Sequence, residues 1–153
     1  MQFMERRGRR PVFSLRAIRG AVQIDMDSQG QIADATVGMI RALIARNGLK
    51  SDDLISFFFT VTPDLTSEIP TLAAAEAGWA HVPMLCAAEM ESTQMIPRTV
   101  RVLVHVHWRN RHRNPSHAYL SGTTSKRPEP SQVVSQPVGM GSLQSLGTDR
   151  RCP

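Results

Sequence analysis

The stretch from Trp79 to Arg101, WAHVPMLCAAEMESTQMIPRTVR, decides how this chain folds and where its chemistry lies. It begins with an apolar segment, residues 82–85, which is followed by Cys86 and by the acid Glu89, and it ends at Arg101 inside a run of valines. A charge within an apolar strand costs free energy unless it has a partner or a ligand. We therefore expect two neighbouring strands to bring Glu89 and Arg101 together as a candidate site.

Alternating apolar and polar residues predict the strands on either side of this stretch. From position 100 onward the valines share one face of a strand, and the other face carries Arg101, Leu103, His105 and His107. Residues 15–24 also alternate, and Gly20 marks an expected bulge or bend. Residues 55–61, which are rich in phenylalanine and β-branched side chains, predict a buried strand.

Two helices are expected. Ser28 is a suitable N-cap residue, and Gly48 is a suitable residue to end a helix. The apolar stripe between them therefore predicts a long helix over 29–47. Pro70 suits a first helical position, and the alanine-rich segment 71–77 predicts a short helix that a glycine closes. Both helices are interpreted as core elements.

The order of elements is strand, helix, strand, short helix, strand, strand, connector and a last strand entered from residues 115–120. This order predicts an α/β (α+β) fold with a mixed β-sheet, one long helix and one short helix. Two helices of this length cannot cover both faces of the sheet. An oligomer that shares sheet faces or edges is the natural remedy.

A chain of 153 residues suits one domain. We expect a basic N-terminal tail over 1–13, the folded domain over 14–128 and a disordered tail over 129–153, where Ser, Pro, Gly and Gln dominate. No run of apolar residues is long enough for a membrane span. The N-terminal arginines are not followed by the apolar segment of a secretory signal, although a transit peptide stays an alternative.

The cysteines bear on the cell compartment in which the protein works, and the net charge bears on the kind of ligand that it binds. Cys86 and Cys152 are far apart in the sequence, so a disulfide framework is not expected and a cytoplasmic location fits better. The formal net charge of +5 fits either solvated positive loops or the attraction of an anion, which could be a small acidic substrate or nucleic acid, and charge alone does not choose between them. Much of the excess positive charge lies in the tails and in the loop 109–113.

Several kinds of chemistry lack their sequence signature. The chain has no phosphate-binding glycine loop and no nucleophile elbow, and its histidines and cysteines lack zinc spacing, so no metal is expected. Cys86 with a histidine has no signature of a thiol nucleophile around it. Arginines beside strands, Arg19 and Arg101, together with Arg127 and one central acid, Glu89, suit a small polyanion, because guanidinium groups bind carboxylates bidentately and stay charged.

Separated blocks carry a resemblance to a known family. They are Arg16-Ala17-Ile18-Arg19-Gly20-Ala21, Thr62-Pro63-Asp64-Leu65, Gly78-Trp79, Val82-Pro83-Met84-Leu85-Cys86-Ala87-Ala88-Glu89, Arg98-Thr99-Val100-Arg101-Val102 and His117-Ala118-Tyr119-Leu120. In this order and spacing they resemble the monofunctional bacterial chorismate mutases of the trimeric pseudo-α/β-barrel class. The resemblance covers residues 14–130.

The resemblance implies an isomerase that converts chorismate to prephenate on the route to phenylalanine and tyrosine. It implies a homotrimer with active sites at subunit interfaces, a dianionic substrate and no cofactor. By residue match, Arg101 faces the ether oxygen of the breaking bond, Glu89 accepts a hydrogen bond from the ring hydroxyl, and Arg19 clamps a carboxylate. The remaining substrate contacts that it implies are Leu85, Cys86, Tyr119, Arg127 and Ile69.

The chain departs from the family pattern at three positions. Ile69 stands where the family usually has phenylalanine, Ala75 where it has arginine, and Lys126 where it has an apolar residue. These departures bear on affinity more than on reaction type. Ala75 and the altered tail also motivate one alternative, an inactive homologue that binds a small carboxylate anion. The other alternative is a basic nucleic-acid-binding module, which lacks a recognition motif and surface aromatic residues.

Overall fold

The structure of the protein is a computed structural model that describes residues 13–123. Its elements, in chain order, are β1 (Ser14–Gln23), α1 (Gln29–Asn47), β2 (Leu54–Val61), α2 (Pro70–Ala74), β3 (Met84–Ala88), β4 (Thr99–Trp108) and β5 (Ala118–Tyr119). A short 3-10 turn, Ser51–Asp53, precedes β2, and a wider helical turn, Ala75–Trp79, follows α2. Both predicted tails, together with Lys126, Arg127 and Cys152, lie outside the described residues.

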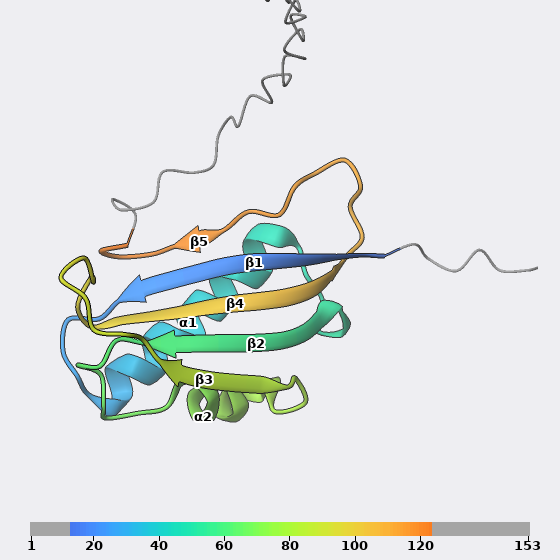
Figure 1. The fold of residues 1–153 in the computed structure, drawn as a ribbon. Coiled ribbons are helices and arrows are strands. Elements are labelled where there is room, and N and C mark those ends of the chain that lie inside the picture. Colours follow the sequence, from blue (N-terminus) through green and yellow to red (C-terminus); the bar gives the residue numbers. More distant parts are fainter. Residues whose placement is uncertain (1–12, 124–153) are drawn as a thin grey trace, which may run out of the picture.

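The strands form one mixed sheet in the order β3-β2-β4-β1-β5. β4 pairs antiparallel with both β1 and β2, whereas β3 runs parallel to β2 and β5 runs parallel to β1. The predicted mixed sheet with a long and a short helix is therefore confirmed (Figure 1). The strand that carries Arg101 is not the neighbour of the strand before Glu89, because β2 lies between β3 and β4, so the expectation of two neighbouring strands was wrong.

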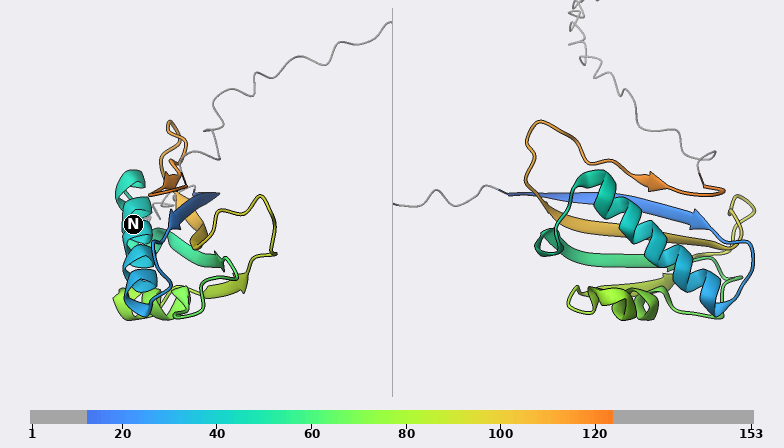
Figure 2. Two further views of the ribbon diagram at one scale, coloured as in Figure 1. Left: turned by 90° about the vertical axis from the view of Figure 1, so that its left-hand side faces the viewer. Right: turned by 180° about the vertical axis from the view of Figure 1, so that it is seen from behind.

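Both helices lie on the same side of the sheet (Figure 2). The predicted bounds of α1 are confirmed: the Ser28 side chain accepts a hydrogen bond from the Gln31 amide, and Gly48 has a left-handed backbone with φ of 60°. The buried side chains of α1 pack against the valine face of β4 and against Phe57 and Phe59 of β2. The principal helix residues in this core are Ile32, Met39, Ile40 and Leu43. In residues 13–123 no helix is long and apolar enough to span a membrane.

Gly20 has a different role from the expected bulge. The pairing of β1 with β4 runs without interruption from Ser14 to Gln23, and Gly20 lies opposite Val102. A Cβ atom at Gly20 would lie 2.9 Å from Leu43 Cδ1 and 2.9 Å from Val102 Cγ1. The expectation of a bulge was therefore wrong: the glycine instead allows helix α1 to approach the sheet closely.

β2 is buried on one face only. Phe57 and Phe59 are buried under the helices, whereas Phe58 points to the opposite face and is 36% exposed. That face has no helix over it, and Leu85 of the adjacent β3 is 61% exposed there. The predicted buried strand is thus correct for alternate residues and wrong for Phe58, because the second face of the sheet has no covering layer within the described chain.

The smaller elements differ from their predicted bounds. The α-helical part of the short helix ends at Ala74 rather than Ala77, and the chain continues as a wide turn until Gly78, whose φ is 109°. The strand expected at 82–85 is β3, two to three residues later in the sequence. The last strand is only β5, because Ala118 and Tyr119 are the only residues of its segment in a parallel pairing with β1.

Candidate active site

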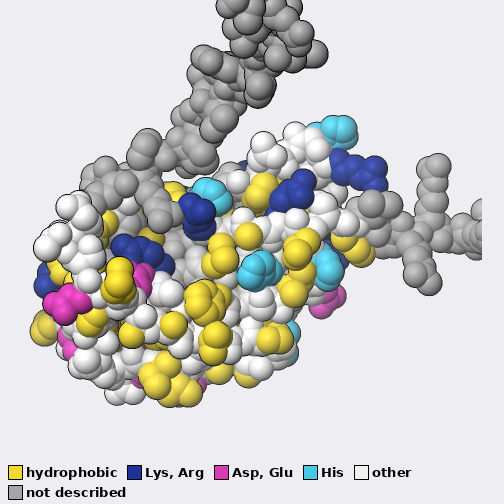
Figure 3. All heavy atoms as spheres, in the orientation of Figure 1, with side chains coloured by type: hydrophobic (Ala, Val, Ile, Leu, Met, Phe, Trp, Pro, Cys, Tyr) yellow, Lys and Arg dark blue, Asp and Glu magenta, His cyan; other side chains and the backbone are white. Residues whose placement is uncertain are grey.

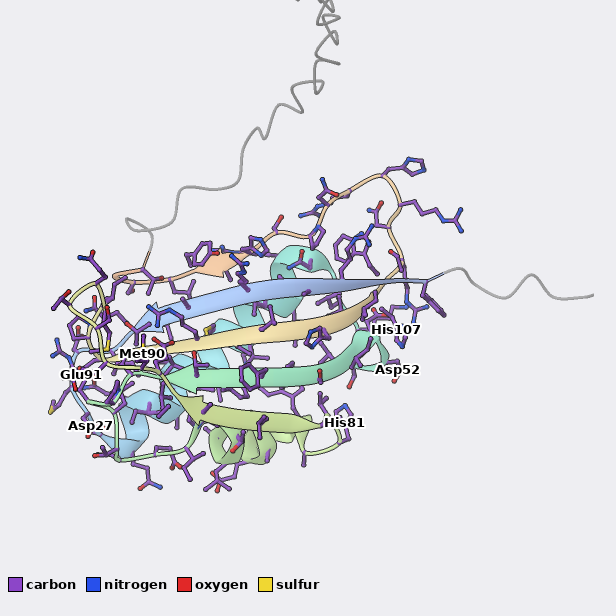
Figure 4. All side chains as sticks on the ribbon, viewed as in Figure 1. Asp27, Asp52, His81, Met90, Glu91 and His107 are labelled. Carbon is purple, nitrogen blue, oxygen red and sulfur yellow. The ribbon has the colours of Figure 1, made fainter. Side chains whose placement is uncertain are left out.

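A cavity of about 920 Å³ lies at one end of the sheet. Phe58, Arg101 and Leu103 line it from the face opposite the helices, and the loop after β3 forms one wall. Acidic and basic side chains lie side by side at this end of the surface, and apolar side chains spread over the rest of the same face (Figure 3). Met90, in the cavity wall, lies at the opposite end of the sheet from His107 (Figure 4).

Glu89 and Arg101 form an ion pair in this cavity. Arg101 Nη1 donates to Glu89 Oε2, and the Thr60 hydroxyl donates to Glu89 Oε1 over 2.6 Å. The Glu89 backbone amide is fixed as well, because it donates to the Val61 carbonyl over 2.8 Å. Thr60, on the intervening strand β2, therefore connects the acid after β3 to the arginine of β4. The side chains of Arg101 and Glu89 are 32% and 20% exposed, so the pair is partly shielded and still accessible.

Arg19 and Tyr119 line the same cavity from β1 and β5. The register explains their proximity: Gly20 lies beside Ala118, and Ala21 lies both beside Tyr119 and opposite Arg101 of β4. Arg19, Arg101 and Glu89 are the only charged residues in the lining among the described chain. Two guanidinium groups and one carboxylate give a net positive lining, which favours an anionic ligand.

The loop between Glu89 and Arg101 contributes a wall that the sequence-based prediction missed. Its lining residues are Met90, Ser92, Gln94, Met95 and Ile96. The sequence could have indicated this wall, because the loop begins next to Glu89 and ends near Arg101 and so has to lie close to both. Glu91 is exposed and is not among the residues of the cavity lining.

Leu85, Cys86 and Ile69 are not brought into this cavity. Leu85 and Ile69 have largely exposed side chains elsewhere on the surface, and Cys86 is half-buried and packs against the core. Burial raises the pKa of the Cys86 thiol, so this group stays protonated near neutral pH and is a poor nucleophile. Ala75, where the family pattern has arginine, lies in the turn after α2 and away from the described lining. Arg127 stays a prediction.

Comparisons with known proteins agree on one family. The family model described as chorismate mutase type I matches residues 15–130. Two curated relatives named Chorismate mutase AroH are similar: the protein of Thermus thermophilus is 34% identical over 75% of this chain and 95% of its own length, and that of Bacillus subtilis is 30% identical over 75% and 91%. A solved chorismate mutase from Clostridium thermocellum superposes with a TM-score of 0.67 at 33% identity, covering 70% of this chain and 96% of its own.

The family match spans every described strand and helix except the first residue of β1, and the solved relative has the same fold over most of that length. The matched region includes the ion pair and the charged residues that line the cavity. The chain therefore belongs to the chorismate mutase type I family.

Proposed function

We propose that the cavity is the site at which this member of the chorismate mutase family converts chorismate to prephenate. The observation that carries the proposal is the ion pair at the cavity surface, in which Glu89, itself bonded by the Thr60 hydroxyl, fixes the guanidinium of Arg101. The rearrangement takes place within one molecule, so the protein must hold one conformer and stabilise developing charge. A rigid, positive cavity supplies both functions.

Arg101 stabilises the oxygen that gains negative charge as the carbon–oxygen bond breaks ahead of carbon–carbon bonding. A guanidinium has five N–H donors, and in residues 13–123 its only bonded carboxylate is Glu89. The remaining donors can therefore bind the ether oxygen. Because the ion pair already fixes the group, this stabilisation requires little reorganisation during the reaction.

Glu89, Arg19 and Tyr119 orient the substrate. Each oxygen of a carboxylate has two acceptor sites, so Glu89 can accept a hydrogen bond from the ring hydroxyl while it holds Arg101 and Thr60. Arg19 binds a substrate carboxylate, and Tyr119 provides a second contact from the neighbouring strand. Holding the dianion in a compact conformer lowers the entropic part of the barrier. No nucleophile is required for this reaction class.

We also propose a homotrimer that shares these sites between subunits. The sheet face opposite the helices carries exposed Phe58 and Leu85, and this apolar surface is typical of a subunit interface. Leu85, Cys86 and Ile69 would then complete the cavity of a neighbouring copy, together with Arg127. A sedimentation experiment that finds a stable, fully active monomer would contradict shared sites.

The direct test is to incubate the purified full-length protein with chorismate and to follow the loss of its ultraviolet absorbance. Loss of absorbance with formation of prephenate supports the proposal. Binding of chorismate without turnover would instead support an inactive homologue, the alternative that Ala75 and the altered C-terminal tail motivate. The same assay on a chain ending near residue 130 asks whether the C-terminal tail affects turnover.

The basic loop gives little support to a nucleic-acid module. Arg109 is paired with Asp53, and Arg113 donates to the Arg46 carbonyl over 2.9 Å, so both guanidinium groups have a structural role. A cytoplasmic location remains our proposal, because neither the wide separation of Cys86 and Cys152 in the sequence nor the reaction implies an oxidising compartment.

A further inference from the structure

We propose that His117 is a positioning residue, which sets Arg19 and Tyr119 in register at the cavity. The inference rests on the proposed function, because both residues are assigned there to the substrate. Its basis is one contact: the Arg19 backbone amide donates to His117 Nδ1 over 3.1 Å. The side chain of a residue two positions before Tyr119 thus binds the main chain of the strand that carries Arg19.

This contact is the first of a series between β1 and the segment 117–123. Further along, Leu120 N–H donates to the Ala21 carbonyl over 2.9 Å, and Gln23 N–H donates to the Ser121 carbonyl over 2.9 Å. These later contacts join two backbones, whereas at Arg19 an imidazole nitrogen is the acceptor. The alignment of the two cavity residues therefore depends on a side chain that titrates.

The C-terminal end of α1 is hydrogen-bonded to the backbone of Ser116 and His117. The Asn47 side chain donates to the Ser116 carbonyl over 2.8 Å and accepts from the Ser116 amide over 2.7 Å, and Arg46 Nη1 donates to the His117 carbonyl over 3.1 Å. The Asn47 side chain is buried and its two bonds to Ser116 are partly buried, whereas the bond from Arg46 is exposed. The imidazole and the Tyr119 ring are also neighbours, with centroids 6.1 Å apart. The backbone before Tyr119 is thus fixed, and the imidazole transmits its position to β1.

The contact requires a neutral imidazole. A neutral ring can accept at Nδ1, whereas an imidazolium has a donor at both nitrogens and would face the Arg19 amide with a second N–H group. Charged and titratable groups near this segment include Arg46 of α1, which donates to the His117 carbonyl, the Tyr119 ring of β5 and Arg113, which is bonded to the Arg46 carbonyl. Protonation of the imidazole would therefore break this contact and loosen the alignment.

The test compares two substitutions of His117. His117→Leu removes the acceptor, and His117→Asn offers an amide oxygen near the same place without a charge change. At neutral pH, His117→Leu should raise KM about two- to tenfold, the range typical of one lost hydrogen bond, with kcat changed less. His117→Asn should restore KM, and it should also remove the rise in KM that we expect of the unmodified protein in acid. His112→Leu, in the exposed basic loop, is the matched control and should leave both constants unchanged.

Amide hydrogen exchange tests the contact without turnover. His117→Leu should speed exchange at Arg19 and leave the Ile24 amide, which donates to the Arg98 carbonyl, protected. Equal protection of Arg19 in both proteins, or an acid-dependent KM that persists in His117→Asn, would overturn the inference. Absence of turnover in the unmodified protein would refute the proposed function instead, and the exchange result at Arg19 would still decide whether the contact exists.

Discussion

β4 has an arginine–carboxylate pair near each of its two ends, and the surroundings of the two pairs differ. At the first end Arg101 pairs with Glu89 at the cavity. Just beyond the other end Arg109 pairs with Asp53, whose side chain is only 4% exposed. The cavity end carries Met90, and the opposite end carries Asp52 (Figure 4). The same two chemical groups therefore occur once in the lining of the cavity and once outside that lining.

The Asp53 pair has the contacts of a structural element. Asp53 Oδ2 accepts the Lys50 amide over 2.9 Å, Oδ1 accepts from Arg109 Nε, and the Arg109 guanidinium lies 4.8 Å from the centroid of the Phe13 ring. The acid thereby closes the turn before β2. An arginine–carboxylate pair indicates a reactive site where a cavity gives the remaining donors access to a ligand, and the described cavity is lined by Arg101 and not by Arg109.

The largest expected effect is on turnover at the cavity end. Arg101→Ala should lower kcat at least about 100-fold, because one lost donor to a developing oxyanion costs roughly 3–4 kcal/mol of barrier. The measurement is the initial rate of chorismate loss at saturating substrate. Arg109→Ala, just beyond the other end of β4, is the matched control and should leave kcat within about twofold. Near-normal turnover by Arg101→Ala would remove the functional distinction between the two pairs.

The next effect is on stability at the opposite end. Asp53→Asn should lower the free energy of unfolding by about 1–2 kcal/mol. This is the usual contribution of a hydrogen bond to a charged group, reduced here because the Arg109 side chain is 51% exposed and water screens the pair. Urea unfolding at neutral pH measures the change. The exposed neighbour substitution Asp52→Asn should stay within about 0.5 kcal/mol. If both substitutions had the same effect, the buried acid would have no special structural role.

The stability that Asp53 contributes should depend on pH in one direction. Burial by itself would raise the pKa of Asp53, but hydrogen bonds from the Lys50 amide and Arg109 and the charge of Arg109 hold that pKa below its ordinary value. A lowered pKa contributes stability that is present above about pH 4, the unfolded value, and is lost as the pH falls through the folded value. The difference in unfolding free energy between the unmodified protein and Asp53→Asn should therefore shrink in urea titrations below pH 4, and a constant difference would contradict this linkage.

The smallest effect concerns the support of Glu89. Thr60→Val removes the hydroxyl that donates to Glu89 Oε1, and it should lower kcat about two- to tenfold because the ion pair keeps its other contact. Ser56→Ala on the same strand removes a hydroxyl bonded to His105 Nδ1 over 2.9 Å, outside the cavity lining. Equal kcat values for these two variants would show that Thr60 does not position the pair.

The sequence predicted the local structure well where the signals were local. The helix over 29–47 was delimited correctly because Ser28 and Gly48 cap it through contacts within a few residues. Gly20 was misinterpreted because its reason is the close approach of α1, a contact between residues far apart in the sequence. The exposure of Phe58 was missed for the same reason, since composition does not show which face of a sheet is covered.

The site shows the same division. The valine strand and the residues around Glu89 placed an acid and a base near one another, but the position of β2 between their strands depends on long-range crossovers. Thr60, a donor to Glu89 from that intervening strand, had no sequence signal of its own. Leu85, Ile69 and Arg127 stay predictions, because a single chain described over residues 13–123 does not contain the surroundings that they require.

Glu89 and Arg101 stand at the two ends of one loop, and their ion pair joins these ends. The contact between the ends does not itself involve any residue of the loop. Doubling such a segment costs only about 0.6 kcal/mol of closure entropy. Insertions at the exposed positions 91–94 should therefore leave both charges in place, whereas Arg98 has to be kept, because its amide donates to Asp64 and its carbonyl accepts from the Ile24 amide. Selectivity for altered ring substituents could be evolved there while the reacting bonds keep their electrostatic partner.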